Sequence, residues 1–187
     1  MNTRPAQPDV AAVLADTRGW LERAVIGLDL CPFAKAVYAG ERIRYCVSDA
    51  ADESALLDDL GRELSALDST PARDCETTLL IHPRVLNDFI EYNAFLGRAD
   101  HKRDSLGLRG AIQIASFHPR YQFAGTAADD VGNFTNRSPY PMLHLLREAS
   151  IARAVAAFPD PAAIFERNIE TLRVLGADGW RRMFPQT

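Results

Sequence analysis

Histidines dominate the residues that could do chemistry. His82 and His118 each precede a proline at the end of a predicted strand, in Leu-Ile-His-Pro and Ser-Phe-His-Pro. His144 lies four residues before Glu148, a spacing that places both side chains on one stripe of a helix. Imidazoles and carboxylates are ligands for zinc, iron or manganese. We therefore expect a divalent metal bound by His82, His118, His144 and Glu148, with His118 and Glu148 in catalytic roles.

A second polar group suggests recognition of a small anionic ligand. The planar guanidinium of an arginine can hold a carboxylate or phosphate at two atoms, and amides and hydroxyls can complete the contact. The predicted substrate-binding residues are Arg137, Asn136, Asn133 and Ser138. In the competing interpretation, Arg137 pairs with Asp129 or Asp130, and the amides and hydroxyl only cap turns.

Structural interpretations also compete with the metal site. A histidine before proline can satisfy buried backbone groups, and His144 can simply bond to Glu148. Cys31 precedes a proline in an apolar turn, which favours a buried, inert thiol. Glu76 lies at the amino end of its strand, opposite the expected site, so we expect a structural ion pair there.

The pattern of apolar residues predicts the elements that position these groups. Three strands are expected over residues 42–47, 76–82 and 111–117. Helices are expected after Asp9, over 53–67, from Pro83, from Pro141 to about Ala157, and from Asp160-Pro161 to Gly176. A long polar loop, residues 118–138, separates the third strand from the helix at Pro141. Loops of this length in compact proteins are commonly functional.

The order strand, helix, strand, helix, strand favours an α/β fold. We expect a small, mostly parallel sheet of three or four strands, covered by helices on both faces, with additional N- and C-terminal helices. Ligands of such sheets collect beyond the carboxyl ends of the strands, where His82 and His118 are placed. The alternative is a ferredoxin-like α+β fold with an antiparallel strand over residues 121–124. Residues 1–187 should form a single domain, with residues 1–8 as a disordered lead.

Composition narrows the classes of partner. The net charge of the 187 residues is −4, so no overall basic field attracts nucleic acid or an anionic membrane. The first residues lack a secretory signal pattern. Three widely spaced cysteines, Cys31, Cys46 and Cys75, argue for reduced thiols. We expect a cytoplasmic protein that binds a small molecule.

Four strings carry a resemblance to a known family: LCPFAK at 30–35, ETTLLIHP at 76–83, IASFHPRYQFAGT at 114–126 and NRSPYPMLHLLREAS at 136–150. They resemble the bacterial family catalogued as domain of unknown function 1415. The resemblance covers nearly the whole chain and implies no activity.

The leading functional hypothesis is therefore a metal-dependent enzyme, a hydrolase or an oxidoreductase, acting on a small polar or anionic metabolite. A second hypothesis is a metal-free binding protein or acid–base enzyme that uses Arg137 as an anion clamp. A third is a non-catalytic ligand-sensing or interaction module. Metal identity, reaction and substrate are not specified by these residues.

Overall fold

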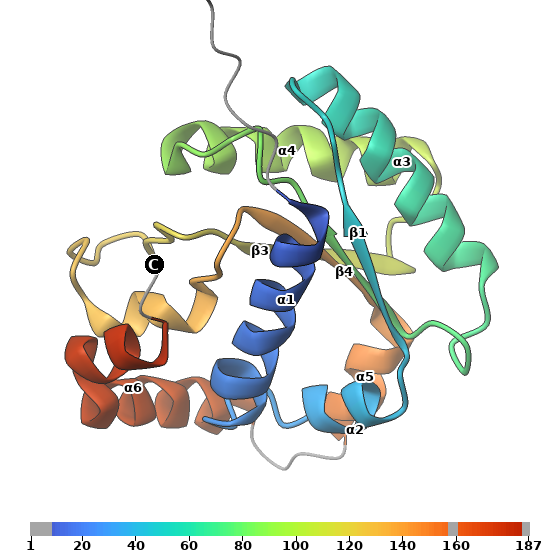
Figure 1. Ribbon diagram of the computed structural model, residues 1–187. Coiled ribbons are helices and arrows are strands. Elements are labelled where there is room, and N and C mark those ends of the chain that lie inside the picture. Colours follow the sequence, from blue (N-terminus) through green and yellow to red (C-terminus); the bar gives the residue numbers. More distant parts are fainter. Residues whose placement is uncertain (1–8, 157–160, 185–187) are drawn as a thin grey trace, which may run out of the picture.

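The computed structural model describes residues 9–156 and 161–184 (Figure 1). The helical segments are α1 (Val10–Trp20), the π-helix η1 (Leu21–Ile26), α2 (Ala34–Ala39), α3 (Glu53–Ser69), α4 (Phe89–Ser105), the 3-10 helix η2 (Val131–Asn136), α5 (Glu148–Ala156) and α6 (Pro161–Met183). The strands are β1 (Ile43–Val47), β2 (Thr77–Ile81), β3 (Ile112–Phe117) and β4 (Met142–Arg147). The predicted lead, residues 1–8, lies outside the described residues.

The four strands form one sheet in the order β1-β2-β4-β3. β1 and β2 are parallel, whereas β4 is antiparallel to both β2 and β3. The predicted α/β class with a small sheet is confirmed, but the expected mostly parallel pairing is wrong, because β4 inserts between β2 and β3. The antiparallel strand is also not the one that the ferredoxin-like alternative placed at residues 121–124, which form a loop.

The error arises from residues 142–147, which the sequence assigned to a helix. Methionine and leucine favour helices in isolation, so Met-Leu-His-Leu-Leu-Arg has the composition of either element. In the fold this segment pairs on both edges, and Met142, Leu143 and Leu145 are fully buried. Burial on both faces of a central strand outweighs local propensity. The helix begins only at Glu148, as α5.

Helices cover both faces of the sheet (Figure 1). On one face, α3 and α4 pack against Leu80, Leu143 and Leu145. The opposite face carries Leu79 and Ile81, which pack with side chains of α1, η1 and α6. Successive residues of a strand point to opposite faces, so each strand contributes to both clusters. The sheet thus separates two apolar layers.

Aspartates cap three of the helices, of which the sequence predicted the starts of α1 and α3 correctly and that of α4 wrongly. The Asp9 carboxylate accepts a hydrogen bond from the N–H of Ala11, and Asp52 caps α3 in the same way. The helix expected at Pro83 instead begins at Phe89, with Asp88 as its cap. Toward the C-terminus, Gly176 (φ 67°) interrupts α6, where the sequence placed its end, and the helix resumes to Met183.

Tyr92 joins α4 to the ends of two strands. Its hydroxyl donates to the Met142 carbonyl at 2.8 Å and accepts from the Phe117 N–H at 3.0 Å. Phe117 ends β3, Met142 begins β4, and the two residues are paired. The ring is fully buried, so water cannot replace the hydroxyl.

We predict that Tyr92→Phe lowers the free energy of unfolding by roughly 2 kcal/mol, because two buried backbone groups lose their partner. Urea unfolding followed by circular dichroism would measure this change. Tyr38→Phe is the matched control, since the Tyr38 hydroxyl bonds to Glu22 near the surface and its loss should change stability little. Equal losses in the two variants would contradict the bridging role of Tyr92.

Candidate functional site

His82 lies directly after β2 and is fully buried. Its Nδ1 is 3.0 Å from the Val85 carbonyl, to which it donates, while no partner for Nε2 is present among the described residues. The ring stacks on Tyr92, with the ring centres 5.8 Å apart. Burial lowers the pKa of His82 to about 4, so the imidazole is neutral near pH 7.

His118 lies directly after β3 and also contacts Tyr92, with the two ring centres 5.0 Å apart. Its Nδ1 accepts from the Arg120 N–H at 3.0 Å, and its Nε2 bonds to the Leu86 carbonyl at 3.2 Å. Both ring nitrogens are therefore used. Desolvation also lowers the pKa of His118. The two histidines hold the loop between β2 and α4, in which Leu86 has a positive φ of 60°.

The third predicted ligand, His144, lies on the opposite face of the sheet. It pairs with Leu79 of β2, and directly paired residues of an antiparallel sheet point to the same face. Leu79 belongs to the α1 side, whereas His82 and His118 contact Tyr92 of α4, which belongs to the cluster on the other face. The shared helical stripe of His144 and Glu148 is also wrong, because β4 ends at Arg147. The three histidines do not form one site.

Within the described residues, no group of three or more histidine, cysteine, aspartate or glutamate side chains is placed to hold a metal ion. Glu148 begins α5, and its backbone N–H donates to the Ala111 carbonyl. Metal dependence stays a prediction of the sequence. The arrangement of the predicted ligands does not support the specific four-residue centre.

Three of the four predicted substrate-binding residues support the long loop. Asn133 is fully buried and binds the backbone N–H of Phe123 through Oδ1. Arg137 donates to the carbonyls of Tyr121 and Ala128 and pairs with neither of the aspartates considered above. The Ser138 hydroxyl donates to a carbonyl two residues away. These side chains form an internal scaffold, which explains how such a polar loop becomes ordered.

Asn136, the fourth, reaches a cleft of about 440 Å³ that also contains His144. The cleft lies between the α1-facing side of the sheet and three helical segments, η1, α2 and α5. Its walls are mostly apolar, and they include Trp20, Leu21, Val25, Phe33, Val37 and Ile151. Leu79, Ala115, Phe117 and Leu146 line it from the sheet. This volume and lining are typical of pockets for small organic ligands.

A hydrogen-bond relay fixes His144 in the cleft. The Thr77 hydroxyl donates its single proton to the Leu145 carbonyl at 2.6 Å. Toward His144 Nε2, at 2.7 Å, it can therefore only accept. Nε2 must carry the ring proton, which makes Nδ1 the acceptor nitrogen of the ring. Burial lowers the pKa of His144 to about 4, so this tautomer is uncharged at neutral pH.

The sequence did not identify Thr77 as a functional residue. It is 67 positions from His144 along the chain, and a buried threonine at a strand start carries no chemical signature. The one signal that could have indicated its position was strand alternation, which places Thr77 on the same face of the sheet as Leu79, the residue that pairs with His144. Cys31, predicted to be buried and inert, is half-buried and lines the cleft, where burial raises the pKa of its thiol; its inertness stays a prediction. All three cysteines are free.

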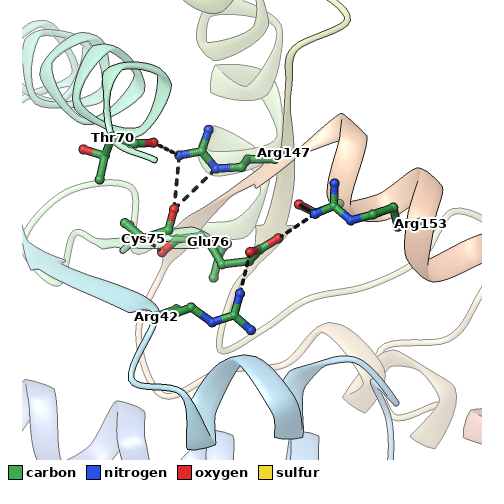
Figure 2. A network of polar contacts seen from close by, with 8 residues as sticks. Arg42, Thr70, Cys75, Glu76, Arg147 and Arg153 are labelled. Atoms are coloured by element: carbon green, nitrogen blue, oxygen red, sulfur yellow. Dashed lines mark hydrogen bonds and ion pairs between the residues drawn. The ribbon is translucent and has the colours of Figure 1, made fainter. Parts of the chain in front are cut away.

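A group of arginines surrounds Glu76 at one edge of the cleft. Figure 2 shows the Glu76 carboxylate between Arg42 and Arg153, which approach it to 2.8 Å and 3.4 Å. The predicted structural ion pair of Glu76 is thus present, at the cleft rather than away from it. Arg147 donates to the carbonyls of Thr70 and Cys75 (Figure 2). Glu76 and Arg147 both line the cleft.

The fold and the cleft define an α/β protein with one closely packed sheet face and one face that leaves room for a small molecule. The family model described as "Protein of unknown function (DUF1415)" matches residues 12–182. The chain belongs to this family, as the four sequence strings predicted. No curated protein and no solved structure matches it. No helix among the described residues is long and apolar enough to cross a membrane.

We predict that the protein loses stability as the pH falls from about 6.5 to about 4. The unfolded chain binds protons in this window, while folded His82, with a pKa of about 4, stays neutral. The contribution of neutral His82 to the free energy of unfolding is therefore fully present above pH 6.5 and is lost as the pH falls toward 4. His82→Asn, whose amide can still donate to Val85, should reduce the loss by up to about 3 kcal/mol.

Urea unfolding at several pH values would measure this effect. His101→Asn is the control, because His101 occupies an exposed position on α4 and should leave the slope of stability against pH unchanged. The same slope in both variants would contradict a neutral, buried His82.

Proposed function

We propose that the protein binds a small, largely apolar molecule in the cleft and recognises a hydrogen-bond donor of that molecule through Nδ1 of His144. The observation that carries this proposal is one oriented imidazole in an otherwise mostly apolar cleft of about 440 Å³. Apolar walls favour a hydrocarbon or aromatic body by removing it from water. The few polar groups then select its orientation.

The conformation of η1, which forms one wall of the cleft, supports a role for the cleft in ligand binding. The chain continues from α1 into a six-residue π-helix, and Leu21 and Val25 of that segment line the cleft. π-Helical turns are rare and recur at functional sites. Here the wider turn contributes two side chains to the wall opposite the sheet.

A second candidate function is acid–base catalysis by the same histidine, and the fixed tautomer favours it. A neutral imidazole with its lone pair on Nδ1 can accept a proton from a bound hydroxyl or N–H group. The resulting imidazolium keeps its Nε2–H bond to Thr77, so the ring need not turn. The anion clamp by Arg137 is not part of this proposal, because its guanidinium binds loop carbonyls.

The binding proposal can be tested with N-phenyl-1-naphthylamine, a neutral fluorescent probe that has an apolar body and one N–H donor. We expect it to bind the wild-type protein with enhanced fluorescence. Ala154→Trp should abolish binding, because Ala154 lines the cleft and the larger side chain fills it. Ala152→Trp is the matched control, since it lies on an exposed part of the same helix and should leave binding intact.

The role of His144 can be separated from that of the apolar walls. 1-Phenoxynaphthalene has nearly the same shape as the probe and lacks the N–H, so it should compete about three- to tenfold less effectively. This preference should disappear in His144→Phe. If Ala154→Trp and its control bind the probe equally, the cleft is not the binding site. If the preference survives His144→Phe, His144 is not the recognition group.

The protonation state of His144 gives an independent prediction. Long-range ¹H–¹⁵N spectra should show the Nε2–H tautomer and titration near pH 4. Thr77→Val removes the oxygen that fixes this state, so its spectra should show a mixture of both tautomers. A single unchanged tautomer in Thr77→Val would contradict the relay through Thr77.

A further inference from the structure

The edge of the cleft that contains Glu76 has more positive than negative charge. Arg42 and Arg153 share the carboxylate of Glu76, as Figure 2 shows. Arg147 is bound by backbone carbonyls, and no carboxylate lies within ion-pair distance of it among the described residues. Three guanidinium groups and one carboxylate leave an excess of two positive charges. The whole chain, in contrast, has a net charge of −4.

These charges are next to the apolar cleft. Glu76, Arg147 and Ser150 line it, and Arg153 donates to the Ser150 hydroxyl at 2.9 Å. The adjacent apolar walls lower the local dielectric, which strengthens attraction for an anion compared with open solvent. A bound anion would therefore be stabilised beside the cleft far more than on the acidic remainder of the surface.

Arg153 is suited to bind a ligand because it is accessible and only loosely held. Its side chain is 65% exposed, while that of Glu76 is 11% exposed. Its contact with Glu76, at 3.4 Å, is longer than that of Arg42. The remaining N–H groups of a guanidinium can bind a second carboxylate in its plane.

We infer that the ligand of the cleft is an amphiphilic carboxylate, with its apolar body against the sheet and its single anionic head group at Arg153 and Arg42. The inference rests on the proposed function, since it names the class of molecule that the cleft accepts. Glu76 competes with the head group for the two arginines. Neutralising Glu76 and removing Arg153 must therefore change affinity for an anion in opposite directions.

Two probes with one aromatic skeleton test this inference. 1-Anilinonaphthalene-8-sulfonate is N-phenyl-1-naphthylamine with an added anionic group, so the ratio of their affinities reports the contribution of charge. Arg153→Gln should weaken binding of the anionic probe about tenfold, and Glu76→Gln should strengthen it by several fold. The neutral probe lacks the anionic group, so both variants should change its affinity far less than that of the anionic probe, and its retained binding shows that the cleft remains folded.

Arg62→Gln on α3 is the control for net charge, because Arg62 pairs with Asp59 and does not line the cleft; it should change neither affinity. Decanoate and its neutral methyl ester, neither of which has a hydrogen-bond donor for His144, then test the carboxylate itself. Decanoate should displace the neutral probe at a lower concentration than methyl decanoate in the wild type and lose this advantage in Arg153→Gln.

Each contrary result has a distinct meaning. Equal effects of Arg153→Gln on the anionic and neutral probes, or equal displacement by decanoate and methyl decanoate, would overturn the anionic head group and leave the cleft as a binding site. Absence of binding of the neutral probe to the wild type would overturn the proposed function itself.

Discussion

The position of β4 between β2 and β3 is the constraint on which the rest of the structure depends. Because it pairs with both neighbours, its alternating side chains are divided between the two faces of the sheet. Leu143 and Leu145 complete the core under α3 and α4, whereas Met142 and His144 face α1. This pairing places the Leu145 carbonyl beside Thr77, so that the Thr77 hydroxyl donates to the carbonyl and accepts from His144. The two contacts orient the His144 ring. The chemistry of the cleft is a consequence of strand register.

The two faces use histidine for different purposes. On the α4 side of the sheet, His82 and His118 donate to carbonyls of one loop and pack against Tyr92, so their imidazoles act as uncharged packing groups with directional bonds. In the cleft, Thr77 binds one nitrogen of His144 and leaves the other as an acceptor. In all three cases burial disfavours the charged ring. The pKa values of His82 and His144 are both lowered, so the pKa does not distinguish them. His144 differs because it lines the cleft.

The sequence was informative where local signals and burial agree. Alternating and continuous apolar runs located β1, β2 and β3, Asp9 located the start of α1, and the helical spacing of apolar residues located α3. It failed at residues 142–147, because residues that favour helices form the central strand when both edges are paired. The helical stripe of His144 and Glu148 was wrong for the same reason, since His144 lies on β4 and Glu148 begins α5. The cleft could not be predicted, because it depends on the space that η1, α2 and α5 leave above the sheet.

The π-helical turn of η1 has a further consequence for how the wall of the cleft tolerates sequence change. A π-turn contains one residue more than an α-turn between the same hydrogen-bonded groups. Deleting one residue from Leu21–Ile26 would let α1 continue as a regular helix. The side chains of this segment that follow the deletion would each rotate by about 100° around the helix axis. Val25 would then leave the wall, although the composition of the segment would hardly change. Homologous chains that differ by such a deletion would differ in cleft shape while the four-stranded sheet stayed the same.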